Sequence, residues 1–176
     1  VDIRVLDEEN QPVPAGEIGE ICVRSPTALT RYINQPEATT EALRGGWYHS
    51  GDLGVQDENG YLYLRDRKRD MIISGGFNIY PAEVENVIMS HPDVVQCAVV
   101  GKPDEKWGEA VSAMITVRPG TSLGLADIQE HCEKSLGRYK VPRYLLVTND
   151  PLPQSGVGKV LRREVRELFT TEGQSS

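Results

Sequence analysis

The densest set of reactive side chains lies in residues 65–85, which read RDRKRDMIISGGFNIYPAEVE. A glycine-containing turn at residues 74–76 follows a basic cluster formed by Arg65, Arg67, Lys68 and Arg69. Guanidinium groups and the N–H groups of a glycine turn both bind anions, so the pattern suits a phosphate ligand. The alternative is a solvated strand edge guarded by charge, and the charge run alone favours that reading. The stretch also separates two differently patterned halves of the chain.

Two further segments carry single groups that could act on a ligand. Asp52 follows a glycine in YHSGDLG, where its carboxylate could accept hydrogen bonds from two adjacent ribose hydroxyls; the alternative is a turn aspartate that caps local N–H groups. Lys159 follows the glycine-rich run SGVG, which could swing a cationic group into an active site; the alternative is an ordinary exposed lysine. The turn residues Gly75 and Gly76 would let another molecule approach the backbone closely.

The composition indicates a packed, acidic protein. Hydrophobic residues make up 39% of the chain, and 19 basic against 26 acidic residues give a net charge of −7, which argues against nucleic-acid binding over the whole surface. The cysteines form no CxxC pair, so we expect reduced, buried thiols at Cys22, Cys97 and Cys132. No metal site is expected, because HxxxH and HExxH spacings are absent around His49, His91 and His131.

The start of the sequence and its apolar runs indicate the expected cellular location of the protein. No apolar run is long enough for a transmembrane helix, and the start VDIRVLDEENQ has no signal-peptide pattern. Because the chain opens inside an alternating strand pattern, we expect a cytoplasmic fragment of a larger protein.

The elements that must position these groups predict an α+β fold. Residues 1–66 read as strands and turns with one short helix at 36–44, and a hairpin turn is expected at 57–60. The second half alternates helices with strands, giving a three-stranded sheet flanked by helices. Its expected helices cover 81–90, 125–136 and 160–169, its strands cover 94–100, 110–117 and 144–147, and residues 102–108 are expected as an exposed loop.

The order and spacing of the motifs say more than each motif alone. The series is GEIGEICVRSP, YHSGDLG, GYLYLRDRKRDMIISGGFNIYPAEVE, YKVP and LPQSGVGKVLRREV. It resembles the carboxyl-terminal part of the adenylate-forming superfamily, which includes acyl-CoA synthetases, luciferases and peptide-synthetase adenylation domains. The resemblance covers residues 1–168 and implies that residues 1–68 end the barrel-like part of a large AMP-binding domain. Residues 69–176 would then form a small mobile domain, with residues 170–176 disordered.

The resemblance also implies roles for the candidate residues. Asp52 would hold the ribose hydroxyls of ATP or AMP, with Arg67 assisting, and Lys159 would contact the carboxylate and α-phosphate during adenylation. Arg69 occupies the hinge position, where the family usually has Asp or Lys. After rotation about that hinge, a coenzyme A tunnel would be lined by Ser74, Gly75, Gly76 and Phe77.

The implied activity is that of an ATP-dependent acid–CoA ligase, which joins a carboxylic acid to AMP and then to coenzyme A. The wording of residues 66–85 resembles ligases of fatty or related acids. Mg²⁺ is expected with ATP but bound outside this chain. The phosphate loop with TSGTTGxPK-like wording is absent, so we expect the fragment alone to be inactive. Its implied partner is an amino-terminal domain of the same chain, through which relatives form dimers.

Two alternatives remain open from the sequence. The chain could belong to an adenylation domain that loads a carrier protein instead of coenzyme A. It could also be a non-catalytic nucleotide-sensing or interaction module that kept the fold without the chemistry. The joint presence of Asp52, Arg67 and Lys159 argues against the second alternative.

Overall fold

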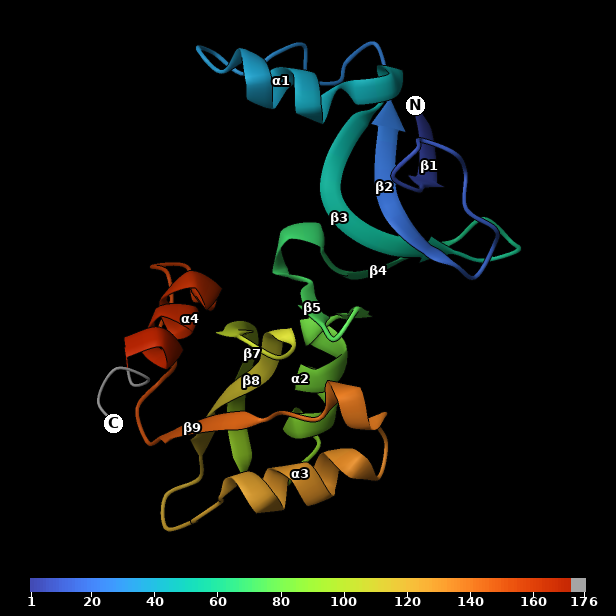
Figure 1. Cartoon of the computed structure of the whole chain (residues 1–176). Helices are drawn as coiled ribbons and strands as arrows, with labels where there is room; N and C mark the ends of the chain where they lie inside the picture. The colour runs from blue at the N-terminus through green and yellow to red at the C-terminus, as the bar shows by residue number, and fades with distance from the viewer. Residues whose placement is uncertain (172–176) are drawn as a thin grey trace. The chain divides into compact units, whose positions relative to one another are not determined.

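The computed structural model of the chain describes residues 1–171, which divide into two compact units (Figure 1). The first unit is Val1–Arg69, and the second begins at Asp70. This division lies beside Arg69, where we expect the family's hinge, but the role of Arg69 as a pivot stays a prediction. No helix in the described part of the chain is long and apolar enough to cross a membrane.

The first unit is an antiparallel sheet in the order β1-β2-β3-β4. Its strands are β1 (Asp2–Leu6), β2 (Ile18–Arg24), β3 (Tyr48–Gln56) and β4 (Leu62–Arg67). Helix α1 (Pro36–Ala42) and a 3₁₀ turn (Arg44–Gly46) connect β2 to β3. The predicted hairpin turn is present between β3 and β4, where Asp57 Oδ1 accepts hydrogen bonds from the N–H groups of Asn59 and Tyr61, each at 2.9 Å.

Strand β3 bends strongly along its length (Figure 1). The bend coincides with irregular pairing, because the register of β3 shifts against both β2 and β4. Gly54 sits at the shift against β4, and a Cβ atom there would lie 2.7 Å from Ile21 Cδ1. The same Cβ atom would lie 3.0 Å from the carbonyl oxygen of Tyr63 on β4, so glycine leaves room for the backbone of the neighbouring strand.

The second unit is built around strand β8 (Gly108–Val117). Its sheet has the order β6-β5-β8-β7, and β9 pairs with β8 in parallel. The other strands are β5 (Ile72–Ser74), β6 (Phe77–Ile79), β7 (Val94–Asp104) and β9 (Tyr144–Thr148). The predicted three-stranded sheet corresponds to β7, β8 and β9, and the short hairpin β5–β6 joins it through the pairing of Ser74 with Gly108.

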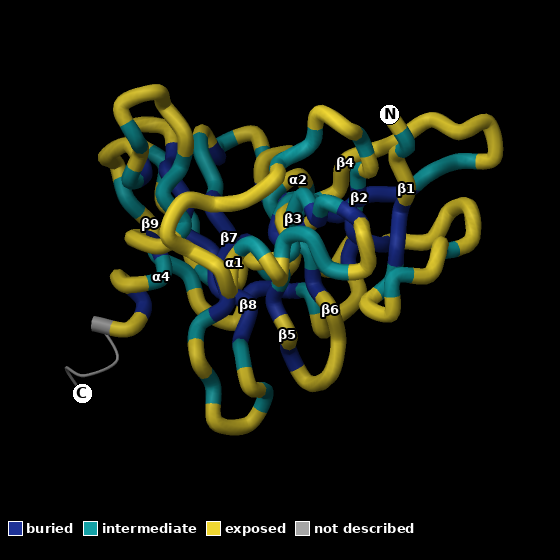
Figure 2. Tube along the Cα trace, turned by 90° about the horizontal axis from the view of Figure 1, so that it is seen from above, coloured by how far each residue is buried: buried dark blue, intermediate teal, exposed yellow. Residues whose placement is uncertain are grey.

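Three helices cover this sheet: α2 (Pro81–Met89), α3 (Leu125–Glu133) and α4 (Arg162–Thr171). One core lies between the sheet and helices α2 and α3, and its members include Val84, Ile88, Val111, Ala113, Ile115, Val117, Ile128 and Cys132. A second core packs α4 on the opposite face and includes Ala98, Val100, Met114, Val165 and Phe169. The residues of β8 alternate between the two cores, as the period of a strand requires. Figure 2 shows buried chain along β7 and β8.

The predicted α+β class is confirmed, with three local differences. Strand β7 extends to Asp104 and β8 begins at Gly108, so the expected loop 102–108 is the tip of a hairpin. Asp104 Oδ1 closes this tip by accepting hydrogen bonds from two following N–H groups. Helix α4 begins at Arg162, because Val160 is paired with Gln154 in a β-bridge. Thr170 and Thr171 continue α4, whereas the rest of the expected disordered tail lies outside the described residues.

One ion pair joins α2 to α4 beside strand β7. Arg162 Nη2 donates to both carboxylate oxygens of Glu85, each at 2.7 Å, and the Val99 N–H donates to Glu85 Oε1 at 2.8 Å. Glu85 therefore satisfies a backbone group of β7 and holds the helix that covers the second core. Because both side chains are largely buried, removing the guanidinium would leave a carboxylate without its cation.

We expect Arg162→Met to lower the free energy of unfolding of the second unit by about 2 kcal/mol, because a charge-assisted hydrogen-bonded pair is lost. Arg163→Met is the matched control, since Arg163 is exposed and pairs only with Glu167 along the helix surface in the described structure. That control should change stability by less than about 0.5 kcal/mol. Urea unfolding followed by circular dichroism measures both variants. Equal losses in the free energy of unfolding would show that the Arg162–Glu85 pair stabilises the unit no more than the exposed Arg163–Glu167 pair.

Candidate functional site

Asp52 and Arg67 form an ion pair on neighbouring strands of the first unit. They are direct register partners on β3 and β4, and Arg67 Nε lies 3.0 Å from Asp52 Oδ1. Both side chains are partly exposed, so a ligand can reach them. Such a pair contributes little to stability, which leaves its groups available to exchange one partner for another.

The backbone before Asp52 has an unusual conformation. Gly51 has φ of +75°, which glycine adopts without strain, and a Cβ atom there would meet nothing within 4 Å. Ser50 Oγ donates to the carbonyl oxygen of Ile21 at 2.6 Å and accepts from the Asp52 N–H at 3.1 Å. The residues of the SGD motif therefore fix where the Asp52 carboxylate projects.

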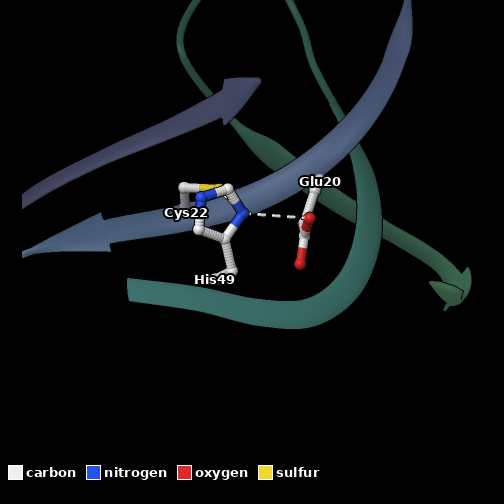
Figure 3. A group of neighbouring side chains, drawn as sticks. All are labelled: Glu20, Cys22 and His49. Carbon is white, nitrogen blue, oxygen red and sulfur yellow. Dashed lines mark hydrogen bonds and ion pairs between the residues drawn. The ribbon is translucent and has the colours of Figure 1, made fainter. Parts of the chain in front are cut away.

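A buried carboxylate, Glu20, lies on β2, where its register partner is Leu53, the residue after Asp52; Figure 3 shows Glu20 with two of its neighbours. Its Oε2 accepts hydrogen bonds from Arg44 Nη2 at 2.9 Å, His49 Nδ1 at 3.0 Å and Lys68 Nζ at 3.2 Å. Its Oε1 accepts from the Gly51 N–H at 3.1 Å. Burial alone would raise the pKa of Glu20, but the bonds from His49, Lys68 and Arg44 outweigh burial and lower the pKa to about 2.

Glu20, Cys22 and His49 offer the ligand types of a metal site, with ligand atoms within 4.8 Å of one another (Figure 3). The charges do not fit a metal ion, because the ammonium of Lys68 and the guanidinium of Arg44 already bind the carboxylate. Burial, and then the charge of Glu20, raise the pKa of Cys22 to about 11, so the sulfur is a protonated thiol instead of a thiolate ligand.

The ionised Glu20 also sets the state of His49. A carboxylate only accepts, so the proton of the bond lies on His49 Nδ1. The buried Nε2 has no hydrogen-bond partner among the described residues. The carboxylate of Glu20 thus forms ion pairs with the guanidinium of Arg44 and the ammonium of Lys68. The other cysteines are also free thiols, as expected, although Cys97 is only partly buried.

The turn between β5 and β6 carries the four residues expected to line a tunnel. Gly75 and Gly76 both have positive φ, at +57° and +83°. The Gly75 N–H donates to the carbonyl oxygen of Trp107 at 2.9 Å, and a Cβ atom on Gly75 would lie 2.8 Å from the Trp107 ring. Ser74 is buried, whereas the exposed Phe77 stacks on Tyr139 with ring centroids 4.6 Å apart. Trp107 thus packs against the turn and shapes it.

Lys159 lies on the exposed side of a tight turn. The Ser155 N–H donates to the carbonyl oxygen of Lys159 at 2.8 Å, and Ser155 Oγ accepts from the Lys159 N–H at 3.2 Å. Gly158 within the turn has φ of +79°. In the part of the chain that the structure describes, no carboxylate forms an ion pair with the Lys159 ammonium, which leaves it able to meet an anionic ligand.

The structure thus brings Asp52 and Arg67 together in the first unit, with Arg69 at the end of that unit in the 3₁₀ turn Lys68–Asp70. The turn 74–77 and Lys159 belong to the second unit. Sequence reasoning missed Glu20 and the hydrogen bonds by which it joins Arg44, His49 and Lys68. A usable signal exists, since Glu20 is a charged residue two positions from Cys22 within an apolar strand pattern, and both residues are buried.

Comparisons with known proteins agree on one family. Residues 83–159 match the family described as AMP-binding enzyme C-terminal domain. The chain is 46% identical over 168 residues to a feruloyl-CoA synthase of Amycolatopsis sp, covering 96% of this chain and 34% of that protein. It is 42% identical over 167 residues to the fatty acid–[acyl-carrier-protein] ligase ScoC of Streptomyces coeruleorubidus, covering 94% and 32%.

Solved structures give the same result. ATP-bound MatB from Rhodopseudomonas palustris matches with a TM-score of 0.88 and 35% identity, over 96% of this chain and 34% of that one. The chain therefore spans about a third of the length of the relatives it matches.

The pKa of Glu20 leads to a pH prediction. A carboxyl whose pKa falls from 4.5 to about 2 on folding stabilises the fold above pH 4.5, and this stabilisation is lost as the pH falls from 4.5 through 2. The expected loss is about 3 kcal/mol. Carbon-detected NMR titration of the Glu20 carboxyl checks the pKa, and urea unfolding across this pH range checks the stability. In Glu20→Gln this component of the pH dependence should be absent. A Glu20 titration midpoint near 4.5 would contradict the assignment.

Proposed function

Because residues 83–159 match the AMP-binding enzyme C-terminal domain family, we propose that this chain is the carboxyl-terminal part of an ATP-dependent acid–CoA ligase. In the first half-reaction a carboxylate oxygen attacks the α-phosphorus of ATP, and pyrophosphate leaves as acyl-AMP forms. In the second, the coenzyme A thiol loses its proton and its sulfur attacks the acyl carbon, and AMP leaves. The observation that carries the proposal is the accessible Asp52–Arg67 pair, which occurs in one chain with Lys159, an exposed residue whose ammonium forms no ion pair within the described residues.

Asp52 and Arg67 are proposed to bind the nucleotide. A carboxylate accepts hydrogen bonds from two neighbouring ribose hydroxyls, and the guanidinium at 3.0 Å keeps that carboxylate ionised and oriented. ATP, acyl-AMP and AMP share this ribose. The pair would therefore serve both half-reactions and would not choose between them.

Lys159 is proposed to act in the first half-reaction. A carboxylate and a triphosphate repel one another, and an ammonium placed between the attacking oxygen and the α-phosphate offsets the charge that develops. This role requires the charged lysine, so Lys159 would not be a general base. Its exposed place on a glycine-containing turn supports the role, because such a turn leaves the side chain free to enter a site.

The second half-reaction is proposed to use the turn 74–77 of the same unit. Gly76 has open space at its Cβ position, so the backbone there could lie against a narrow pantetheine chain without a side chain in the way. Lys159 and this turn would serve different steps, and rotation of the second unit about Arg69 would present them in succession. The 3₁₀ turn Lys68–Asp70 at the unit boundary supports this place for the pivot.

The acid and the thiol acceptor are proposed only as classes. The similar proteins include a feruloyl-CoA synthase and a fatty acid–[acyl-carrier-protein] ligase, so aromatic and fatty acids both enter the test panel. The second similarity also favours a carrier protein as the alternative acceptor, which a phosphopantetheinylated carrier in place of coenzyme A would reveal. Mg²⁺ bound to ATP is proposed to be held outside this chain; among the described residues, the cluster of Glu20, Cys22 and His49 does not fit a metal ion.

In the complete ligase, Lys159→Ala should lower acid-dependent pyrophosphate release by about 10²- to 10³-fold, because the ammonium is lost where charge develops. Thioester formation from supplied acyl-AMP should stay within about threefold of the wild type, since that step lacks the repulsion. Arg163→Ala, which removes a neighbouring exposed charge, is the matched control and should leave both rates unchanged.

The 176-residue chain assayed by itself serves as the negative control, since it lacks the phosphate loop and should release no pyrophosphate. Equal loss of both half-reactions in Lys159→Ala would refute the role given to Lys159. Pyrophosphate release by the short chain would refute its proposed dependence on a larger domain.

Arg69→Pro tests the pivot, because proline fixes φ and removes an N–H donor at that position. We expect the complete ligase to keep one half-reaction within about threefold and to lose overall turnover by at least about 10²-fold, as one orientation is trapped. Arg69→Lys keeps the charge and the backbone freedom and should behave as the wild type. Separate measurement of the two half-reactions decides, and normal overall turnover in Arg69→Pro would exclude a pivot at this residue.

A further inference from the structure

We propose that Glu20 is a positioning residue for the Asp52–Arg67 pair. It binds the residue before Asp52 and the residue after Arg67, and this clamp sets the geometry of the pair. This inference rests on the proposed function, since it gives the pair a nucleotide to bind. Glu20 itself is buried and would touch no substrate. Its effect would pass through the residue before Asp52 and the residue after Arg67.

The clamp follows from the hydrogen bonds of the carboxylate. Oε1 accepts from the N–H of Gly51, which directly precedes Asp52 on β3. Oε2 accepts from the ammonium of Lys68, which directly follows Arg67 at the end of β4. One side chain of β2 therefore binds β3 and the first residue after β4, at the positions adjoining the pair.

The strand pairing shows why a side chain is needed at this place. Glu20 pairs with Leu53 and Cys22 with His49, so three residues of β3, 50–52, face the single residue Ile21 of β2. Within this bulge the ladder cannot give every backbone group its regular partner. Glu20 takes the N–H of Gly51, and Ser50 Oγ takes the carbonyl oxygen of Ile21 and the N–H of Asp52. Side chains thus hold the part of β3 that presents Asp52.

The Asp52–Arg67 pair cannot fix its own geometry. Both side chains are partly exposed, and a pair of that kind is held weakly against water and salt. Glu20 is the opposite case, because its side chain is only 6% exposed and four donors satisfy it. A buried, fully hydrogen-bonded carboxylate can hold the backbone that carries Asp52 and Arg67. This arrangement presents a ligand-binding pair with little motion.

The partners of Glu20 supply matched variants. Lys68 and Arg44 are both cations bound to Oε2, at 3.2 and 2.9 Å. Lys68 adjoins Arg67, whereas Arg44 lies in the 3₁₀ turn before β3 and adjoins neither member of the pair. Replacing either by Met removes one cation from the same oxygen, so a purely structural role predicts similar effects for both. A positioning role predicts that nucleotide binding changes only in Lys68→Met.

The experiment uses the complete ligase with a saturating acid and coenzyme A. We expect Glu20→Gln to raise the KM for ATP and the inhibition constant of AMP in parallel by about tenfold, because both ligands share the ribose. Lys68→Met should raise both constants by about threefold with kcat within twofold, and Arg44→Met should leave both constants within 1.5-fold. Should Glu20→Gln fail to fold, the comparison of Lys68→Met with Arg44→Met decides alone. Equal constants in those two variants would overturn the clamp.

A second readout separates this inference from the proposed function. Wild-type ligase that forms no acyl-AMP with any acid would overturn the proposed function, whatever Glu20 does. Hydrogen exchange of the peptide containing residues 50–52 then tests the clamp in the 176-residue chain. We expect Glu20→Gln to speed this exchange at least fivefold. If Glu20→Gln does not fold, Lys68→Met should speed exchange at Arg67 instead. Arg44→Met should leave the exchange rates unchanged. Exchange at the wild-type rate in the variant tested would overturn the clamp.

Discussion

A carboxylate that is removed from water must have its charge met by nearby donors, and Glu20 imposes this constraint on the first unit. Arg44, His49 and Lys68 bring their donors to one oxygen, and the backbone of Gly51 brings a donor to the other. These donors come from β3, from the turn before it and from the end of β4. The carboxylate therefore determines where three separate segments meet, and the accessible pair proposed to bind nucleotide lies directly beside that meeting point.

The chemistry assigned to the chain is divided between its two units. The first unit holds the pair that would bind the part common to ATP, acyl-AMP and AMP. The second holds Lys159 and the turn 74–77, which would serve one step each. A single site that held Lys159 and the turn 74–77 at once would need room for a phosphate-binding ammonium and a passage for the thiol. Both would have to lie beside the carbonyl carbon of the same acid substrate. Presenting Lys159 and the turn 74–77 in succession would remove that conflict. It would require that the Asp52–Arg67 pair remain fixed while the second unit changes place.

Local patterns in the sequence predicted most of the elements. The helix predicted at 81–90 corresponds to α2, and the hairpin turn predicted at 57–60 is present, because both depend on neighbours a few residues apart. The order of motifs pointed to Asp52, Arg67 and Lys159, whose roles stay predictions. It did not point to Glu20, because the role of Glu20 depends on the bulge that sets Glu20 and Cys22 against β3, and pairing irregularities leave no periodic signal. The sequence predicts a loop at 102–108 instead of a hairpin tip for a related reason, since Asp104 closes the tip through hydrogen bonds that spacing alone does not show.

The central claim is that the Asp52–Arg67 pair, held in place by Glu20, binds the ribose of the nucleotide. A crystal structure of the complete ligase with AMP tests this most directly. We expect both ribose hydroxyl oxygens within about 3 Å of the Asp52 carboxylate, with Glu20 still bound to Gly51 and Lys68. A structure in which AMP is bound elsewhere, with its ribose away from Asp52, would contradict the claim.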